Sequence, residues 1–233
     1  MNTDPVLQVQ NLRFGYEPGQ TLIDIGSFTI RKGESVFLRG PSGSGKSTLL
    51  GLIGGVLTPN AGSVKICGQD ITDITPGQRD QIRADHLGII FQQFNLLPYL
   101  SVIQNCEVPC RFSAIRKQRA IKMSGTVMAA ARTLVTALGL SEDHLSRPVG
   151  ELSVGQQQRV AVARALIGGP DLIIADEPTS ALDHDNRDKF IELLNSQRDA
   201  FSSSLLFVSH DNTLATYFDR SESLNDLNQG VIA

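Results

Sequence analysis

The stretch GPSGSGKST, at residues 40–48, decides the fold of this chain. It fits the pattern G-x-x-x-x-G-K-[ST], whose defining positions are Gly40, Gly45, Lys46 and Ser47. Glycine removes the side chains that would hold the backbone away from a phosphate, and the helix expected after the loop adds its positive N-terminal dipole. The stretch therefore predicts a phosphate-binding loop, in which Lys46 reaches the β- and γ-phosphates and the Ser47 hydroxyl binds Mg²⁺.

The sequence on either side of this loop argues against a flexible Gly/Ser linker. Residues 35–38 read as a buried strand, and Leu49, Leu52 and Ile53 fall on one apolar helix face. A strand, a glycine-rich loop and a helix in this order are the context in which the pattern binds nucleotides. We expect the whole loop to contact the nucleotide: Gly40, Pro41, Ser42, Gly43, Ser44, Gly45, Lys46, Ser47 and Thr48.

Length and composition restrict the class of protein. The chain has 233 residues, 41% of them hydrophobic, which suffices for the core of one domain. Its net charge is −3 with no basic block, so we expect no nucleic-acid partner. The sequence shows no apolar run of membrane-spanning length and no leader in residues 1–10. We therefore expect a cytoplasmic protein that reaches a membrane only through a partner.

The cysteine count is odd, with Cys67, Cys106 and Cys110. Cys106 and Cys110 are four residues apart and could share a helix face as a metal or redox pair. No third or fourth ligand lies near them in the sequence. We expect three free thiols in a reducing compartment.

Short apolar runs predict an α/β fold. Residues 6–14 and 22–30 read as an antiparallel β element, whereas 87–91, 172–175 and 205–208 are runs typical of buried parallel strands. Helical segments between these runs favour a mainly parallel core sheet.

The middle of the chain is basic and rich in alanine from about residue 95 to residue 145, and strand signals vanish there. High helix propensity predicts a helical insertion, placed at about 95–165 within a single domain of residues 1–233. We expect its charged side chains, Arg116 and Lys117 among them, to form solvated helix faces.

An acidic pair at the end of a predicted strand supplies the second half of the site. Asp176 ends the apolar run and can hold Mg²⁺, while Glu177 points elsewhere and can polarise a water for attack on the γ-phosphate. His210 follows the run at 205–208 and so lies at the carboxyl edge of a strand, where α/β sheets bind ligands. We assign only ordinary surface or core roles to the other histidines, His86, His144 and His184.

Two further segments complete the pattern. The run LSVGQQQR, at 152–159, places Ser153 and Gly155 at a helix start, which can bind a second anion or simply be capped by Ser153. The run SALD, at 180–183, reads as a turn in which Asp183 caps the next helix.

With these motifs in this order, nearly the whole chain resembles the ATP-binding-cassette (ABC) ATPases. The resemblance implies a P-loop NTPase fold with an N-terminal antiparallel β element and an inserted helical subdomain. It implies ATP and Mg²⁺ as ligands, with Tyr16 stacked on adenine. The expected catalytic residues are Lys46, Glu177 and His210, the expected Mg²⁺ ligands are Ser47, Gln92 and Asp176, and the other expected nucleotide contacts are Ser153, Gly155 and Asp183.

The resemblance also implies a head-to-tail homodimer that forms with ATP. Ser153 and Gly155 of one chain would close over ATP held on the phosphate loop of the other. Val154 stands where the family usually has glycine. Because Ser153 and Gly155 are both present, we expect an active enzyme, and Glu177 and His210 argue against a module that binds ATP without turnover.

Residues 87–98, LGIIFQQFNLLP, resemble the branch that contains lipoprotein-releasing and macrolide-export ATPases. That branch implies a peripheral ATPase on the cytoplasmic face of the inner membrane, driving a separate integral membrane permease that exports or extrudes hydrophobic cargo. Amino-acid importers share parts of this stretch and remain an alternative. A soluble ABC ATPase that acts on ribosomes or DNA is the other alternative, although such proteins usually carry two cassettes, a coiled coil or basic extensions.

Overall fold

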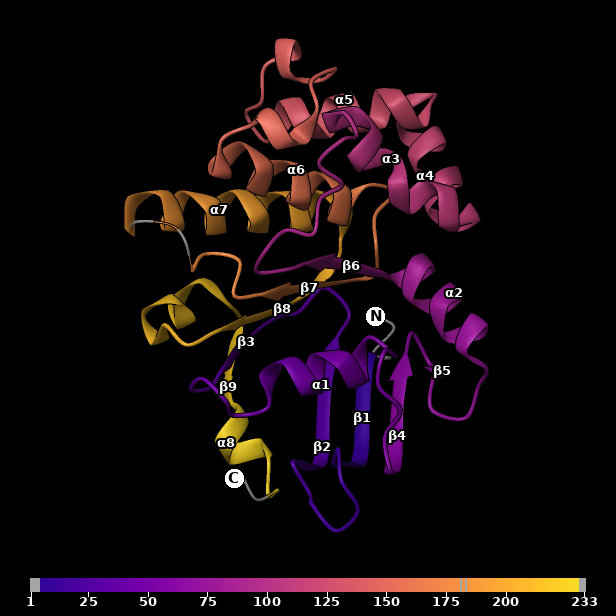
Figure 1. The fold of residues 1–233 in the computed structure, drawn as a ribbon, viewed down its shortest axis with the longest axis vertical. Helices are drawn as coiled ribbons and strands as arrows, with labels where there is room; N and C mark the ends of the chain where they lie inside the picture. Colours follow the sequence, from indigo (N-terminus) through magenta and orange to yellow (C-terminus); the bar gives the residue numbers. More distant parts are fainter. Residues whose placement is uncertain (1–4, 181, 183, 231–233) are drawn as a thin grey trace.

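Two β-sheets and a group of helices form the computed structural model, which describes residues 5–180, 182 and 184–230 (Figure 1). The smaller sheet is antiparallel, with the strand order β2-β1-β4-β5. Its strands are β1 (Pro5–Phe14), β2 (Ile23–Arg31), β4 (Ala61–Ile66) and β5 (Gln69–Asp70).

The larger sheet is parallel throughout its described strands, with the order β6-β7-β8-β3-β9. It comprises β3 (Ser35–Arg39), β6 (Leu87–Ile90), β7 (Leu172–Asp176), β8 (Ser204–Ser209) and β9 (Arg220–Ser223). All residues of β8 are buried, as expected for a strand covered on both faces. The carboxyl ends of β3, β7 and β8 meet at one edge of this sheet, where a pocket beside the glycine-rich loop lies.

The helices divide between the two sides of the parallel sheet (Figure 1). They are α1 (Lys46–Ile53), α2 (Pro76–His86), α3 (Val102–Phe112), α4 (Ala114–Ser124), α5 (Val127–Ala137), α6 (Val154–Leu166), α7 (His184–Phe201) and α8 (Leu224–Leu227). Short 3₁₀ turns cover Glu142–His144, Val149–Glu151 and Asn212–Tyr217. No described helix is long and apolar enough to cross a membrane.

The side chains of β3 separate two hydrophobic cores. Phe37 packs with the core formed largely by α3, α5, α6 and α7, whereas Val36 and Leu38 pack with α1 and the antiparallel sheet. This division follows from the alternation of side chains along a strand. The parallel sheet therefore holds the phosphate loop rigidly, because packed apolar side chains support β3 from both faces.

The structure confirms the expected α/β class, with a parallel core sheet, an antiparallel β element and helices between β6 and β7. Sequence analysis did not predict the hairpin of β4 and β5. Both residues of β5 are exposed, so this strand carries no apolar run. The boundaries of the helical insertion, about 95–165, stay a prediction.

Arg116 contradicts the expectation that the charges of the insertion face solvent. Its side chain is 2% exposed, and its guanidinium donates hydrogen bonds to the carbonyl oxygens of Ile167, Leu87 and Ala165 at 2.8, 3.1 and 2.7 Å. Burial lowers the pKa of Arg116 to about 10, so the group remains charged at neutral pH. Arg116 therefore ties α4 to β6 and to the end of α6, while its neighbour Lys117 is exposed as expected.

Candidate functional site

The loop between β3 and α1 has the conformation that its glycines permit. Gly43 and Gly45 have φ angles of 82° and 91°, in the left-handed region that other residues adopt only with strain. A pocket of about 620 Å³ lies against this loop. Loop residues 41–43 and 45–48 form part of the pocket lining. The lining also includes four residues from other segments: Gln92, Asp176, Glu177 and His210.

Lys46 is buried beneath the phosphate loop. Its Nζ donates hydrogen bonds to the carbonyl oxygens of Gly40 and Pro41 at 2.8 and 2.9 Å, and it lies 3.6 Å from Oε1 of Glu177. Two carbonyl oxygens and one carboxylate thus hold the ammonium at the bottom of the loop. A single buried cation in this position fits a polyphosphate, which brings several negative charges.

The start of α1 is also suited to an anion. Gly45 is the N-cap residue and offers no side-chain acceptor to the first turn of the helix. The N–H groups of that turn therefore depend on another acceptor, which a phosphate can supply. Gly40 and Ser44 support the loop from behind, since a Cβ at Gly40 would lie 2.6 Å from Ser44 Oγ.

The oxygen-bearing side chains expected to hold Mg²⁺ line the same pocket: Ser47, Gln92 and Asp176. Burial, followed by the nearby charge of Glu177, raises the pKa of Asp176 above its usual value, while Lys46 opposes that shift. A divalent cation would relieve this cost. A hydroxyl, an amide oxygen and a carboxylate are the hard donors that Mg²⁺ prefers, so the residues present fit the ion.

Glu177 sits at the junction of β7 and β8. Its Oε2 lies 2.9 Å from Nδ1 of His210 and accepts a hydrogen bond of 3.3 Å from the Ser209 hydroxyl. Its backbone N–H donates to the Val208 carbonyl at 2.9 Å, and its φ is 45°, which is rare outside glycine. Strained residues of this kind gather at functional sites, where surrounding contacts hold them in place.

Ser209 is a site residue that sequence analysis missed. A serine directly before His210, at the end of an apolar strand, was the available signal. Its hydroxyl also accepts a hydrogen bond of 3.2 Å from the Asp211 N–H, so it links the Glu177 carboxylate to the turn after β8. Ser209 therefore orients Glu177 in this structure.

Tyr16 lies beside the loop, although it does not line the pocket. Its ring is 66% exposed and packs edge-on against Phe14, with ring centroids 5.0 Å apart. Its hydroxyl is 3.3 Å from Oγ1 of Thr48. An exposed ring anchored at one end can present a face to a planar base. The contact between Tyr16 and adenine stays a prediction.

The segment Leu152–Arg159 does not join this pocket. Ser153 is the N-cap of α6, and its hydroxyl accepts from the Gln156 N–H at 3.3 Å in a capping box. Ser153 is exposed, Val154 is 55% exposed, and nothing lies within 4 Å of a Cβ built on Gly155. The segment thus faces outward with an open helix start. Asp183 lies outside the described residues.

Comparison with known proteins decides the family. A family model described as ABC transporter matches residues 23–180, which include the loop, Gln92, Ser153, Gly155, Asp176 and Glu177. This chain is an ABC transporter ATPase. The ABC ATPases hydrolyse ATP, so the pocket beside Lys46 is the expected place of that reaction in this ABC ATPase.

Relatives of this ABC ATPase agree with the assignment. An uncharacterised ABC transporter ATP-binding protein of Mycobacterium tuberculosis is 37% identical over 227 residues, covering 96% of this chain and 88% of the relative. The macrolide export ATP-binding/permease protein MacB of Salmonella typhimurium is 37% identical over 95% of this chain. The alignment covers only 33% of the length of MacB.

The fold of this ABC ATPase also matches a solved structure. The ATP-binding cassette MJ0796, in a dimeric post-hydrolysis state bound to ADP and Pi, superposes with a TM-score of 0.80 at 33% identity. The match covers 97% of this chain and 96% of MJ0796. The mixed arrangement of parallel and antiparallel sheets is therefore that of an ABC ATPase.

Proposed function

We propose that this ABC ATPase hydrolyses ATP to drive an integral membrane permease subunit, on the cytoplasmic face of the inner membrane. The convergence of Lys46, Glu177 and His210 on one pocket beside the phosphate loop is the observation that carries the proposal. A protein that binds ATP without hydrolysing it would need no buried carboxylate in this pocket. The expected absence of a nucleic-acid partner rests on the net charge of −3.

The residues divide the chemical work in this proposal. Backbone N–H groups of the loop and the Lys46 ammonium bind the phosphates, and Ser47, Gln92 and Asp176 hold Mg²⁺, which neutralises charge on the phosphate oxygens. Glu177 accepts a proton from the attacking water or orients that water. His210, which lies 2.9 Å from Glu177 Oε2, contacts the γ-phosphate and fixes the carboxylate.

The outward-facing segment at Ser153 and Gly155 supports a head-to-tail homodimer. These residues lie away from the pocket of their own chain, so they can reach ATP only on a second chain. A hydroxyl at the N-terminus of α6 is a suitable contact for a γ-phosphate. The solved MJ0796 structure, which is dimeric and holds ADP and Pi, is consistent with such an arrangement.

Two observations support an exporter and a permease contact on the helical side. MacB, a macrolide export ATP-binding/permease protein, is 37% identical to this chain. The insertion at about 95–165 carries exposed apolar side chains away from the start of α6: Tyr99, Phe112, Ile115, Ile121, Met123 and Met128. Exposed apolar patches mark protein interfaces. We propose that residues 1–233 form a single ATP-binding domain, in which Gln92 and this insertion contact the permease. We also propose that the cargo is hydrophobic.

The variant Glu177→Gln tests the proposed function. An amide preserves size but cannot accept a proton, so phosphate release should fall at least ~100-fold while ATP-Mg²⁺ still binds. ATP trapped between two chains should then yield a dimer on size-exclusion chromatography that the wild type does not accumulate. Phosphate release and elution volume are measured on the same samples.

Glu142→Gln is the matched control, because Glu142 is exposed and pairs only with Arg132 among the described residues. It should hydrolyse ATP at the wild-type rate. Full activity in Glu177→Gln would transfer the role of base to another residue and contradict the proposal.

A further inference from the structure

A cysteine, a histidine and an aspartate meet at the end of β7 that is remote from the nucleotide pocket. Asp171 directly precedes β7, whereas Asp176 ends it. One ligand atom from each of Cys67, His86 and Asp171 lies within 4.8 Å of the others. The ABC ATPase reaction uses none of these three residues, so their grouping needs its own explanation.

Rigid backbone holds the three residues in place. His86 is the last residue of α2, and its carbonyl oxygen accepts a hydrogen bond of 2.9 Å from the Asp171 N–H. The next residues, Leu87 and Leu172, pair in the parallel sheet. Cys67 lies in the tight turn between β4 and β5. The cluster therefore joins the antiparallel sheet, α2 and the parallel sheet at one point.

An ion pair explains two of the three residues. His86 Nδ1 is 2.8 Å from Asp171 Oδ2, and the hydrogen bond to Asp171 raises the pKa of His86 to about 9. Arg119 Nη1 approaches the same oxygen at 3.4 Å. In this state a proton occupies the centre of the cluster, and a metal ion would have to displace it.

Cys67 lies outside this ion pair, although its side chain also contributes, after Asp171, to the raised pKa of His86. Its φ is 49°, in the left-handed region where asparagine, aspartate and glycine are the usual residues, and Gly68 follows with φ 78°. A turn of this type gains nothing from a thiol. A thiol placed within reach of an imidazole and a carboxylate is, however, a typical set of ligands for a borderline metal.

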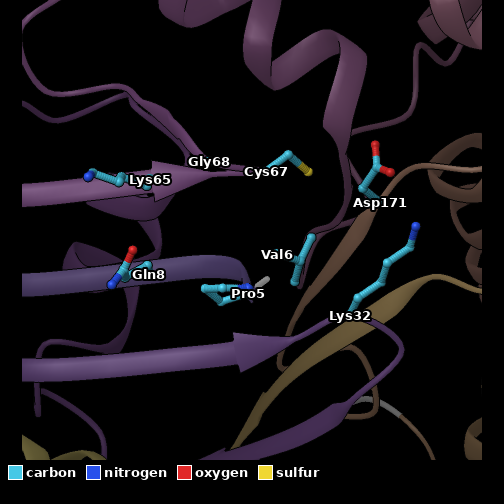
Figure 2. A pocket seen from close by; sticks show the side chains of 8 residues that line it. All are labelled: Pro5, Val6, Gln8, Lys32, Lys65, Cys67, Gly68 and Asp171. Carbon is cyan, nitrogen blue, oxygen red and sulfur yellow. The ribbon is translucent and has the colours of Figure 1, made fainter. Parts of the chain in front are cut away.

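Two residues of the cluster, Cys67 and Asp171, line a pocket of about 410 Å³. Figure 2 shows the Cys67 sulfur, the Asp171 carboxylate and the Lys32 ammonium pointing toward the same space, while Lys65 points away from it. A fourth ligand can therefore enter from solvent. The positive charge of Lys32 favours an anionic fourth ligand, such as hydroxide or chloride, over a second cation.

We propose that Cys67, His86 and Asp171 bind one Zn²⁺ ion, with the fourth coordination position open to this pocket. A thiolate, a neutral imidazole and a carboxylate together carry two negative charges, which balance the two positive charges of the ion. Binding releases the protons of the thiol and the imidazole. The soft sulfur ligand disfavours Mg²⁺ and Ca²⁺, so this site is chemically distinct from the nucleotide site.

The required movement is small. Tetrahedral bonds of about 2.0 Å to nitrogen and oxygen and about 2.3 Å to sulfur place ligand atoms about 3.3–3.6 Å apart. The donor atoms already lie within 4.8 Å of one another, so they are close to this spacing before any ion binds. Arg119, whose side chain is 40% exposed, can then leave Asp171 for solvent.

Titration of the full chain with Co²⁺, a spectroscopic substitute for Zn²⁺, tests the proposal. One Co²⁺ per chain should give a thiolate-to-cobalt charge-transfer band in the near ultraviolet, and one equivalent of Zn²⁺ should abolish it. Binding of Co²⁺ to the oxygen ligands of the nucleotide site cannot give this band. Cys67→Ser should lose the band, and His86→Gln, which keeps a donor for Asp171, should bind at least ~10-fold more weakly.

Two matched controls should keep the band and the affinity. Cys110→Ala removes a different thiol, and Asp176→Asn removes a carboxylate at the nucleotide pocket. Thermal melts of the metal-free proteins establish that each variant is folded. The proposal is overturned if the wild type gives no charge-transfer band, if the band persists in Cys67→Ser, or if His86→Gln binds with wild-type affinity.

Discussion

At the scale of single residues, the nucleotide pocket depends on the Lys46 ammonium. The group is buried and donates to the carbonyl oxygens of Gly40 and Pro41, while Glu177 supplies the nearest carboxylate. Without nucleotide, the loop carbonyls thus keep the cation in position. A polyphosphate that enters the loop meets this charge, and a charge-assisted hydrogen bond is stronger than one between neutral groups.

Lys46→Ala should weaken ATP-Mg²⁺ binding by roughly 30-fold, or about 2 kcal/mol, because the phosphates lose one charge-assisted hydrogen bond. Isothermal titration measures the affinity, and circular dichroism establishes that the fold is retained. Lys65→Ala, at a half-buried strand position remote from the loop, should bind ATP as the wild type does. Unchanged affinity in Lys46→Ala would contradict the phosphate-loop assignment.

At the scale of elements, Arg116 connects the helical side of the molecule to the parallel sheet. Its guanidinium reaches carbonyl oxygens of Leu87 in β6, Ala165 in α6 and Ile167 just after α6. These acceptors belong to buried residues, so each loses a hydrogen-bond donor when the side chain is removed. The contact fixes α4 relative to the sheet, and thereby the surface that we propose for the permease.

Arg116→Ala should lower the free energy of unfolding by at least about 3 kcal/mol, because several buried carbonyl oxygens lose their donor. Urea unfolding followed by circular dichroism gives this value. Lys117→Ala, one residue further along the same helix but exposed, should change stability by less than about 0.5 kcal/mol. Similar stabilities for the two variants would show that the Arg116 contacts do not hold α4 in place.

At the scale of the whole molecule, we propose that the start of α6 and the pocket are two halves of a site that one chain does not complete. Ser153 caps α6, Gly155 leaves open space beside the helix, and the exposed Val154 lies between them. A β-branched side chain stiffens this turn but leaves the Ser153 hydroxyl free to face a partner.

Val154→Gly should change the ATPase rate by less than about tenfold, equivalent to about 1.4 kcal/mol of barrier. Ser153→Arg should abolish ATP-dependent dimerisation, because its side chain fills the space of the partner's γ-phosphate. Ser153→Asp keeps a good N-cap yet adds a repelling carboxylate, so it should also fail to dimerise. Phosphate release and light scattering with ATP are the measurements. Wild-type dimerisation by Ser153→Asp would argue against a phosphate contact at α6.

The sequence alone determined the parts of this protein that depend on local pattern. The phosphate loop is encoded by nine consecutive residues, and its backbone conformation follows from Gly43 and Gly45. Buried parallel strands such as β7 and β8 are continuous apolar runs, so their carboxyl ends, with Glu177 and His210, could be placed at one edge of the sheet beforehand. That the Oε2 of Glu177 pairs with the Nδ1 of His210 was seen only in the structure.

Only the tertiary structure decided the features made by residues far apart in the chain. No local pattern distinguishes the buried Arg116 from the exposed Lys117, because the acceptors that compensate its charge lie in β6 and around the end of α6. No spacing relates Cys67, His86 and Asp171, which meet because a hairpin turn, a helix end and a strand start converge. The environment of a side chain depends on the elements that pack against it. The residues next to that side chain in the sequence do not specify how distant segments pack.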